Sequence, residues 1–300
     1  MPKDPIAKNE LAVEADFYGL DGLVKDIKLP LIDISQFLPN KTLKQWKTEA
    51  NLRTAFLNGS AKGFIDPFRG LVALFPQGKN DDEDELSLPL QYNPNHENLI
   101  AAKKQDAQFM ETLRSHSNDD SNDSNPNVTV KTLGAFRSNF NRHWSNVLHR
   151  LQNVLLEEPV IIAGGAVLRA LTDSRNIRTQ KWWTHGSGVR NPSDIDLFLY
   201  TNDKEEANRI SRRIFYSVAI DNEKWLVIRS RGVINIHRSL NGRVDAKIQI
   251  VLRLYDSPTE VLIGFDVDCC CCAYDGRNVW VCPRWISSLT SGLVVLNPLQ

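Results

Sequence analysis

Apolar and polar residues are arranged in the second half of the chain so that predicted strands and helices follow one another. Residues 160–163 form an apolar run that predicts a buried strand, and a helix is expected to open at residues 166–171. Residues 194–200 predict a second strand, and residues 204–218 predict a helix because their apolar positions recur at three- and four-residue spacing. This order of elements is typical of an α/β fold.

Later apolar runs extend the predicted sheet. Strands are expected at residues 225–236, 244–255, 265–274 and 279–282. The first two are joined by Asn241-Gly242, which is a strong signal for a tight hairpin turn. We therefore expect an α/β (α+β) domain with a mixed sheet.

The first half of the chain predicts helices and a polar linker. A helix is expected from about Asn40 to Leu57, ended by Asn58-Gly59, and one continuous helix is expected from residue 136 to residue 155. Residues 117–127 read SNDDSNDSNPN, which is too polar to bury a core. We therefore expect a mostly helical N-terminal region over residues 1–135, with a linker near 116–128, followed by the α/β domain over 136–300.

Two aspartates interrupt the apolar run at residues 194–200. Asp194 and Asp196 stand two positions apart, so on a strand their side chains point to the same face. Two like charges on a buried strand are unfavourable unless a cation neutralises them, and a divalent cation with oxygen ligands is the usual one. Upstream, Gly164-Gly165 closes the first strand before a helix, which is a favourable place for a phosphate. Together the two motifs predict a metal-dependent nucleotide site.

These motifs resemble those of the DNA polymerase beta-like nucleotidyltransferase superfamily. The strings IIAGGAVLRAL and SDIDLFLY are most similar to the head of the CCA-adding and bacterial poly(A) polymerase branch, over about residues 136–292. The resemblance implies transfer of a nucleoside monophosphate from an NTP, with Mg²⁺ or Mn²⁺, to a hydroxyl of RNA, a protein or a small molecule. A further string, IQIVLRLY…EVL…FDVD…YDG, is similar to a group of eukaryotic and giant-virus proteins, and supplies no function.

The same resemblance implies roles for the two motifs. Asp194 and Asp196 would be catalytic and would hold two magnesium ions that bridge the triphosphate. Gly164 and Gly165 would let backbone amides approach the phosphates, and the following helix would add its dipole.

A third carboxylate should complete the metal site from a neighbouring strand. Asp245 is the first choice, because it alternates onto the same face as Lys247 and Gln249. Asp266 or Asp268 is the second choice, because the two form another pair of aspartates at i and i+2 on a predicted strand.

The chain also departs from the family pattern. Gly165 stands where the family usually has a serine, and 28 residues separate Gly165 from Asp194, more than is usual in the family. No Arg-Arg-Asp motif follows, so CCA addition itself is not expected. If Gln249 occupies the position of the third acid, the metal site is incomplete, and the alternative is a catalytically inactive domain used for binding or as a scaffold.

The long insertion between the two motifs has a composition of its own. Lys181 and Arg190 flank Trp182 and Trp183, and cations interleaved with aromatic rings contact phosphates and stack on bases. We therefore assign Lys181 and Arg190, with Ser193 just before the aspartates, to nucleotide binding. The alternative is a loop that folds back and buries the two tryptophans.

Composition narrows the class of protein further. Among 300 residues, 36 Lys and Arg balance 36 Asp and Glu. The chain therefore has no strong overall electrostatic field that would attract nucleic acid or membranes. No apolar run approaches the roughly 20 residues that span a bilayer, so we expect no membrane contact and a cytoplasmic location.

Four of the five cysteines are consecutive, at residues 269–272, and are expected to be small apolar residues of a buried strand rather than a disulfide or zinc site.

Overall fold

The structure is a computed structural model that describes residues 40–59, 66–75, 129–172, 194–219, 224–240 and 243–294. All of these residues lie in the second of two compact units, Pro39–Gln300, which follows the unit Met1–Leu38.

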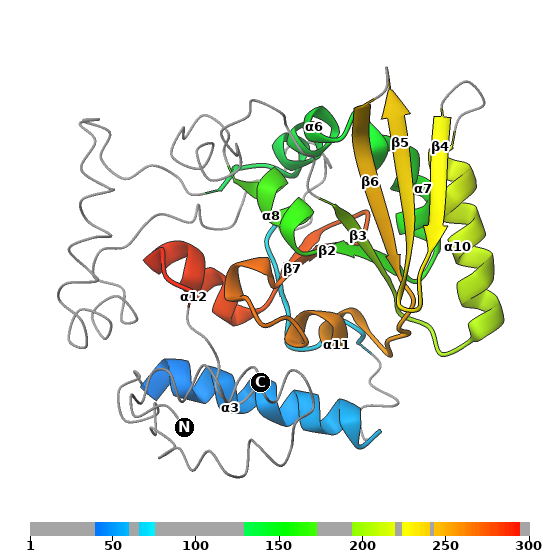
Figure 1. Cartoon of the computed structure of the whole chain (residues 1–300). Helices are drawn as coiled ribbons and strands as arrows, with labels where there is room; N and C mark the ends of the chain where they lie inside the picture. The colour runs from blue at the N-terminus through cyan, green and yellow to red at the C-terminus, as the bar shows by residue number, and fades with distance from the viewer. Residues whose placement is uncertain are drawn as a thin grey trace, which may run out of the picture. The chain divides into compact units, whose positions relative to one another are not determined.

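The described residues of this unit form one mixed sheet of eight strands in the order β1-β8-β7-β2-β3-β6-β5-β4 (Figure 1). β3 and β6 are parallel, and the other neighbouring pairs are antiparallel. The predicted mixed α/β class is therefore confirmed. The strands are β1 (Val72–Ala73), β2 (Val160–Ala163), β3 (Ile195–Leu199), β4 (Lys224–Arg229), β5 (Val233–Leu240), β6 (Arg243–Val251), β7 (Cys272–Tyr274) and β8 (Val279–Val281).

Helices cover the sheet, and two of them have clear capping residues. The side chain of Asp203 accepts from the N–H groups of Glu205 and Glu206, and Gly292, with φ 68°, ends the last helix. The helices are α3 (Asn40–Leu57), α6 (Leu133–His143), α7 (Val147–Glu157), α8 (Gly165–Leu171), α10 (Lys204–Val218), α11 (Pro258–Ile263), the 3-10 helix η2 (Asp268–Cys270) and α12 (Pro283–Ser291).

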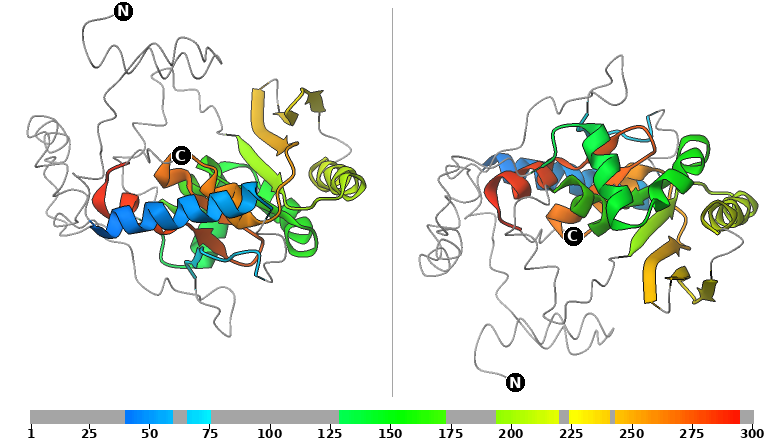
Figure 2. Two further views of the ribbon diagram at one scale, coloured as in Figure 1. Left: turned by 90° about the horizontal axis from the view of Figure 1, so that it is seen from below. Right: turned by 90° about the horizontal axis from the view of Figure 1, so that it is seen from above.

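The central strands lie at the core of this unit. All four residues of β2 are buried, as are four of the five residues of β3, with Asp196 as the half-buried exception. α7 packs against α10 and β2, whereas α11 and α12 both contact α3, which Figure 2 shows in blue. β2 and β3 are therefore among the most deeply buried parts of the fold.

Two described pieces of the predicted N-terminal region belong to this packing. β1 pairs with β8, and α3 contacts α11 and α12. The predicted boundary between residues 135 and 136 remains a prediction, and the predicted linker near 116–128 lies outside the described residues.

The predicted continuous helix over 136–155 is wrong, because the chain forms α6 and α7 instead. Ser145 and Asn146 separate them with positive φ angles of 49° and 63°, and a left-handed residue ends an α-helix. The break places Trp144 in the core, fully buried against Phe140.

Two predicted strands are also wrong in extent. The run at 225–236 is a hairpin of β4 and β5, because residues 230–232 (Ser-Arg-Gly) turn the chain. The run at 265–274 begins as a turn and the 3-10 helix η2, and only Cys272 to Tyr274 form a strand, β7. The cysteine run is thus divided: Cys271 and Cys272 are buried and the two before them half-buried, all with free thiols.

No helix within the described ranges is long and apolar enough to cross a membrane. The cytoplasmic location stays a prediction.

Candidate functional site

The glycine turn after β2 uses its two glycines differently. Gly164 has φ 85° and ψ −144°, a conformation that favours glycine, and its N–H donates to the carbonyl of Cys272 at 2.9 Å. Gly165 begins α8, and a Cβ there would meet no atom within 4 Å. Because the amide of Gly164 belongs to the sheet, a phosphate contact at this turn falls to Gly165 and the amides after it.

The aspartate pair lies beside this turn. β2 and β3 are antiparallel, and Ala163 at the end of β2 pairs with Asp196 near the start of β3. Asp194 immediately precedes β3, so the carboxylates and the glycines come to the same end of the paired strands β2 and β3.

The two carboxylates have different surroundings. Asp194 Oδ2 lies 2.5 Å from Lys247 Nζ, in an ion pair whose side chains are about 30% exposed. Among the described residues, no hydrogen bond or ion pair reaches the carboxylate of Asp196. Burial, and then the charge of Asp194, raise the pKa of Asp196 to about 6, although Lys247 opposes this shift.

The neighbouring strand presents an amide where a third acid was considered. In the parallel register of β3 and β6, Gln249 pairs with Asp196. Gln249 Nε2 donates to Asn235 Oδ1 at 2.7 Å, which leaves the amide oxygen of Gln249 as an acceptor. Asp245 lies four residues earlier on β6, roughly 13 Å along the strand, and its side chain is outside the described residues. Its role as third ligand stays a prediction.

The second-choice acids lie in other surroundings. Asp268 belongs to η2, is buried, and pairs with Arg284 at 2.8 Å. Asp266 is exposed in the turn before it. Because neither lies on the strand that was predicted there, the i, i+2 argument for this pair does not apply.

The donor set fits a divalent cation only in part. Within the described ranges, no group of three His, Cys, Asp or Glu side chains could hold a metal ion. Two carboxylates and one amide oxygen are nevertheless the kind of ligands that Mg²⁺ and Mn²⁺ prefer. Asp196 is half-buried, has no partner among the described residues and stands beside a second carboxylate, so a cation would stabilise this position.

Three predicted nucleotide-binding residues belong to the long insertion between the two motifs. Lys181, Arg190 and Ser193, with the two tryptophans of the insertion, all lie in residues 173–193, outside the described residues. Their assignment stays a prediction.

Sequence reasoning missed the role of Lys247 as the counter-charge of Asp194. It placed Lys247 on the same face as Asp245 and Gln249, which was the available signal. The sequence alone does not give the order of the strands in the sheet, and this order decides which residues lie beside β3.

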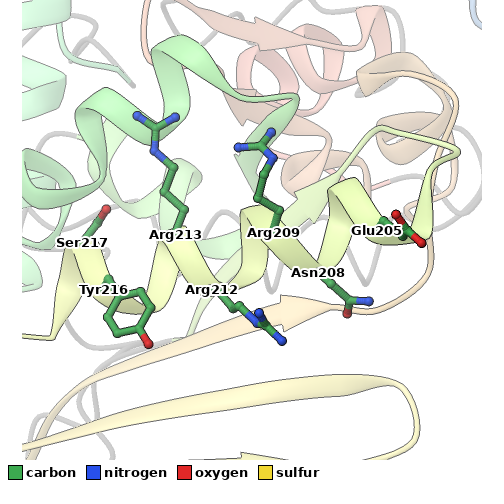
Figure 3. A pocket seen from close by; sticks show the side chains of 7 residues that line it. All are labelled: Glu205, Asn208, Arg209, Arg212, Arg213, Tyr216 and Ser217. Carbon is green, nitrogen blue, oxygen red and sulfur yellow. The ribbon is translucent and has the colours of Figure 1, made fainter.

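A basic surface on α10 is a separate feature with its own neutralising charges. Figure 3 shows Arg209 and Arg213 on one side of the helix and Arg212 and Tyr216 on the other. Arg209 binds the buried Glu158 through two hydrogen bonds of 2.7 and 2.6 Å, and Arg213 also pairs with Glu158. Hydrogen bonding to Arg209 contributes most to lowering the pKa of Glu158 to about 2. Arg209 and Arg213 therefore hold α10 to the end of α7 and are not free to bind a phosphate.

Comparisons with known proteins cover the part of the chain that holds the site. Residues 135–292, slightly more than half of the chain, match a family described as Gabija anti-defense 2 family protein. An uncharacterized protein of Acanthamoeba polyphaga mimivirus is 29% identical over 171 residues, which are 52% of this chain and 33% of that protein. The chain therefore spans about a third of the length of this relative.

A solved structure shows a weaker likeness. The complex of a CCA-adding enzyme with CTP matches 52% of this chain and 37% of its own, at 16% identity and a TM-score of 0.29. A TM-score of this size supports no conclusion about function.

Proposed function

The chain belongs to the Gabija anti-defense 2 family, and we propose that it fulfils an anti-defense role through a nucleotidyltransferase-like site. In this proposal the α/β domain binds an NTP together with Mg²⁺ or Mn²⁺ and transfers its nucleoside monophosphate to an acceptor hydroxyl. The acceptor is a hydroxyl of RNA, a protein or a small molecule.

The observation that carries the proposal is the pairing of Ala163 with Asp196. It brings the glycine turn, with a helix behind it, next to two carboxylates on one strand face. One element can thus approach phosphate oxygens closely, and the other can bind the cation that accompanies them.

Each residue then has a chemical task. Asp194 and Asp196 would hold the cation, which when bound neutralises phosphate charge and polarises the reacting phosphoryl group. The turn at Gly165 would receive phosphate oxygens, and Lys247, displaced from Asp194, would pair with them. In the transfer, the acceptor oxygen forms a bond to the α-phosphorus, the bond from this phosphorus to the bridging α–β oxygen breaks, and pyrophosphate leaves. The hydroxyl proton passes to solvent.

A second candidate function is nucleotide-independent binding by an inactive domain. The ion pair of Lys247 with Asp194 favours it, because the protein already supplies a cation to this carboxylate. Gln249 beside Asp196 favours it also, since an amide brings no negative charge to a metal site.

A thermal-shift series distinguishes the two functions. The full chain is heated with each of the four NTPs, with and without Mg²⁺ or Mn²⁺, beside the double variant Asp194→Asn/Asp196→Asn. A nucleotidyltransferase-like site predicts a metal-dependent stabilisation of about 2.7 kcal/mol at 100 times Kd in the wild type and none in the double variant. The matched control is Glu205→Gln, which removes one exposed carboxylate charge from α10 and should respond like the wild type. A folded wild type that responds to no NTP would favour the inactive domain.

A further inference from the structure

A pocket of about 260 Å³ lies beside β3, and Phe198 of that strand is part of its lining. Asp196 and Phe198 are two residues apart on this strand, so their side chains share a face and are roughly 6.5 Å apart along it. Phe198 lines the pocket, together with residues of α3, α11 and the segment after β6. Phe198 thus places the pocket on the strand face that also carries Asp196.

Three aromatic rings connect the pocket with the glycine turn. Phe198 makes edge contacts with Tyr255 and Phe265, with ring centroids 5.8 and 5.7 Å apart. The ring of Phe265 also lies 3.7 Å from the position that a Cβ on Gly164 would take. One apolar wall therefore extends from the end of β2 into the pocket.

Polar groups complete the pocket at its mouth. The guanidinium of Arg253 lies 4.7 Å from the ring centroid of Tyr255, and its Nη2 donates to Glu260 at 3.0 Å. The side chain of Arg253 is 63% exposed, whereas that of Glu260 is 16% exposed. Arg53 of α3 lines the pocket as well and donates to the carbonyl of Ile263. Aromatic faces, a planar cation and a carboxylate acceptor are the groups on which proteins stack and hydrogen-bond nucleobases.

We propose that this pocket binds the nucleoside of the NTP, with the base stacked on the platform formed by Tyr255 and Arg253. The ribose then spans the interval from Phe198 to Asp196. This proposal rests on the proposed function for the binding of the triphosphate. The pocket itself would bind the base and the ribose, and so a nucleoside without phosphates. A peptide is a poorer occupant, because β3 is paired on both sides and offers no strand edge to it.

The test measures binding of nucleosides and NTPs to the full chain by titration calorimetry. Adenosine, guanosine, cytidine and uridine are titrated without metal, and the NTPs with Mn²⁺. Tyr255→Leu and Arg253→Ala should each weaken binding of the preferred nucleoside and of its NTP by about 5- to 100-fold, as expected for the loss of one stacking contact. Tyr255→Phe keeps the ring and should bind like the wild type.

Matched controls lie on α10. Tyr216→Leu and Arg212→Ala change the same residue types at a separate surface, where Tyr216 is 75% exposed, and should leave binding unchanged. Circular dichroism verifies folding. If Tyr255→Leu does not fold, the exposed Arg253→Ala carries the test.

The outcomes separate this proposal from the proposed function. Nucleoside binding that persists in Asp194→Asn/Asp196→Asn and falls in Tyr255→Leu supports the pocket, even if no NTP shows metal-dependent binding. Metal-dependent NTP binding of equal strength in wild type, Tyr255→Leu and Arg253→Ala overturns the pocket and leaves the proposed function standing. A wild type that binds no nucleoside at millimolar concentration also overturns the pocket.

Discussion

Lys247 Nζ lies 2.5 Å from Asp194 Oδ2, where β6 runs parallel to β3. The ammonium group supplies the positive charge that a divalent cation would otherwise supply to this carboxylate. Asp196, one alternation further along the strand, has no such partner among the described residues. A cation that binds both carboxylates therefore competes with Lys247 at the first and meets an unpaired charge at the second.

Replacing Lys247 should separate these two effects. Without metal, we expect Lys247→Met to lower the free energy of unfolding at pH 7 by up to about 1 kcal/mol, because the pair is partly exposed and its charges are screened by solvent. With Mn²⁺, the variant should gain more in melting temperature than the wild type does, because the ammonium group no longer competes for Asp194. Lys204→Met, at an exposed position of α10, is the control. Equal responses of Lys247→Met and the wild type to Mn²⁺ would contradict a metal site at Asp194.

The raised pKa of Asp196 makes the stability of the fold depend on pH. Its pKa is about 6 in the folded chain, whereas the ordinary pKa of an aspartate is 3.8. The folded state therefore keeps this proton to a higher pH than the unfolded state does. The bound proton therefore stabilises the folded state below pH 4, and this stabilisation is lost as the pH rises through 6. The loss in the free energy of unfolding is at most about 3 kcal/mol.

Asp196→Asn removes this dependence. We expect the variant to be more stable than the wild type at pH 7.5 in the absence of metal, and nearly equal to it at pH 4, as measured by urea unfolding. The pKa of Glu49 is also raised, but Glu49 is present in both proteins and its effect cancels. A variant that is no more stable than the wild type at pH 7.5 would show that burial of Asp196 has little effect on the fold.

The local parts of the site were predictable from sequence, because their geometry depends on neighbouring residues. A glycine pair after an apolar run and two aspartates at i and i+2 specify a turn and a common face without knowledge of the rest of the chain. The partner of Asp196 depends instead on strand order. Lys247 and Gln249 alternate onto one face of β6, and only the parallel register with β3 brings Gln249 to Asp196 and Lys247 within reach of Asp194.

Breaks inside long patterned segments were harder to predict for a similar reason. Trp144 is buried in the core at the break between α6 and α7. The apolar pattern of the sequence therefore continues across this break and does not reveal it. The left-handed Ser145 and Asn146 carry no strong turn signal in the sequence. Likewise, the residues that line the pocket beside Phe198 come from α3, β3, the segment after β6 and α11, which only tertiary packing brings together.

The two glycines of the turn offer a matched pair of substitutions. Gly164→Ala should lower the free energy of unfolding by about 1–3 kcal/mol, because φ 85° is strained for any residue with a Cβ. Gly165→Ala should change it by less than about 0.5 kcal/mol, since the new methyl group meets no atom within 4 Å. Urea unfolding of both variants gives the comparison. Equal losses at the two positions would show that the turn does not have the described conformation.

A buried arginine lies between an acid of α3 and an acid of η2 and connects α3 with the rest of the unit. Arg284 is 2% exposed and lies 2.8 Å from both Glu49 of α3 and Asp268 of η2, although the contact with Glu49 lacks hydrogen-bond geometry. Burial is the largest cause that raises the pKa of Glu49, to about 7, and Arg284 opposes it.

Arg284→Met leaves both acids buried without their shared cation, so we expect the free energy of unfolding at pH 8 to fall by about 3–5 kcal/mol. At pH 6 the loss should be smaller, because Glu49 is then mostly protonated and less charge remains uncompensated. Glu49→Gln should cost much less than Arg284→Met at either pH, since the ion pair of Arg284 with Asp268 persists. Arg277→Met, at an exposed position, should remain within about 0.5 kcal/mol of the wild type. A loss in Arg284→Met that is equal at pH 6 and pH 8 would mean that Asp268, rather than Glu49, carries the uncompensated charge.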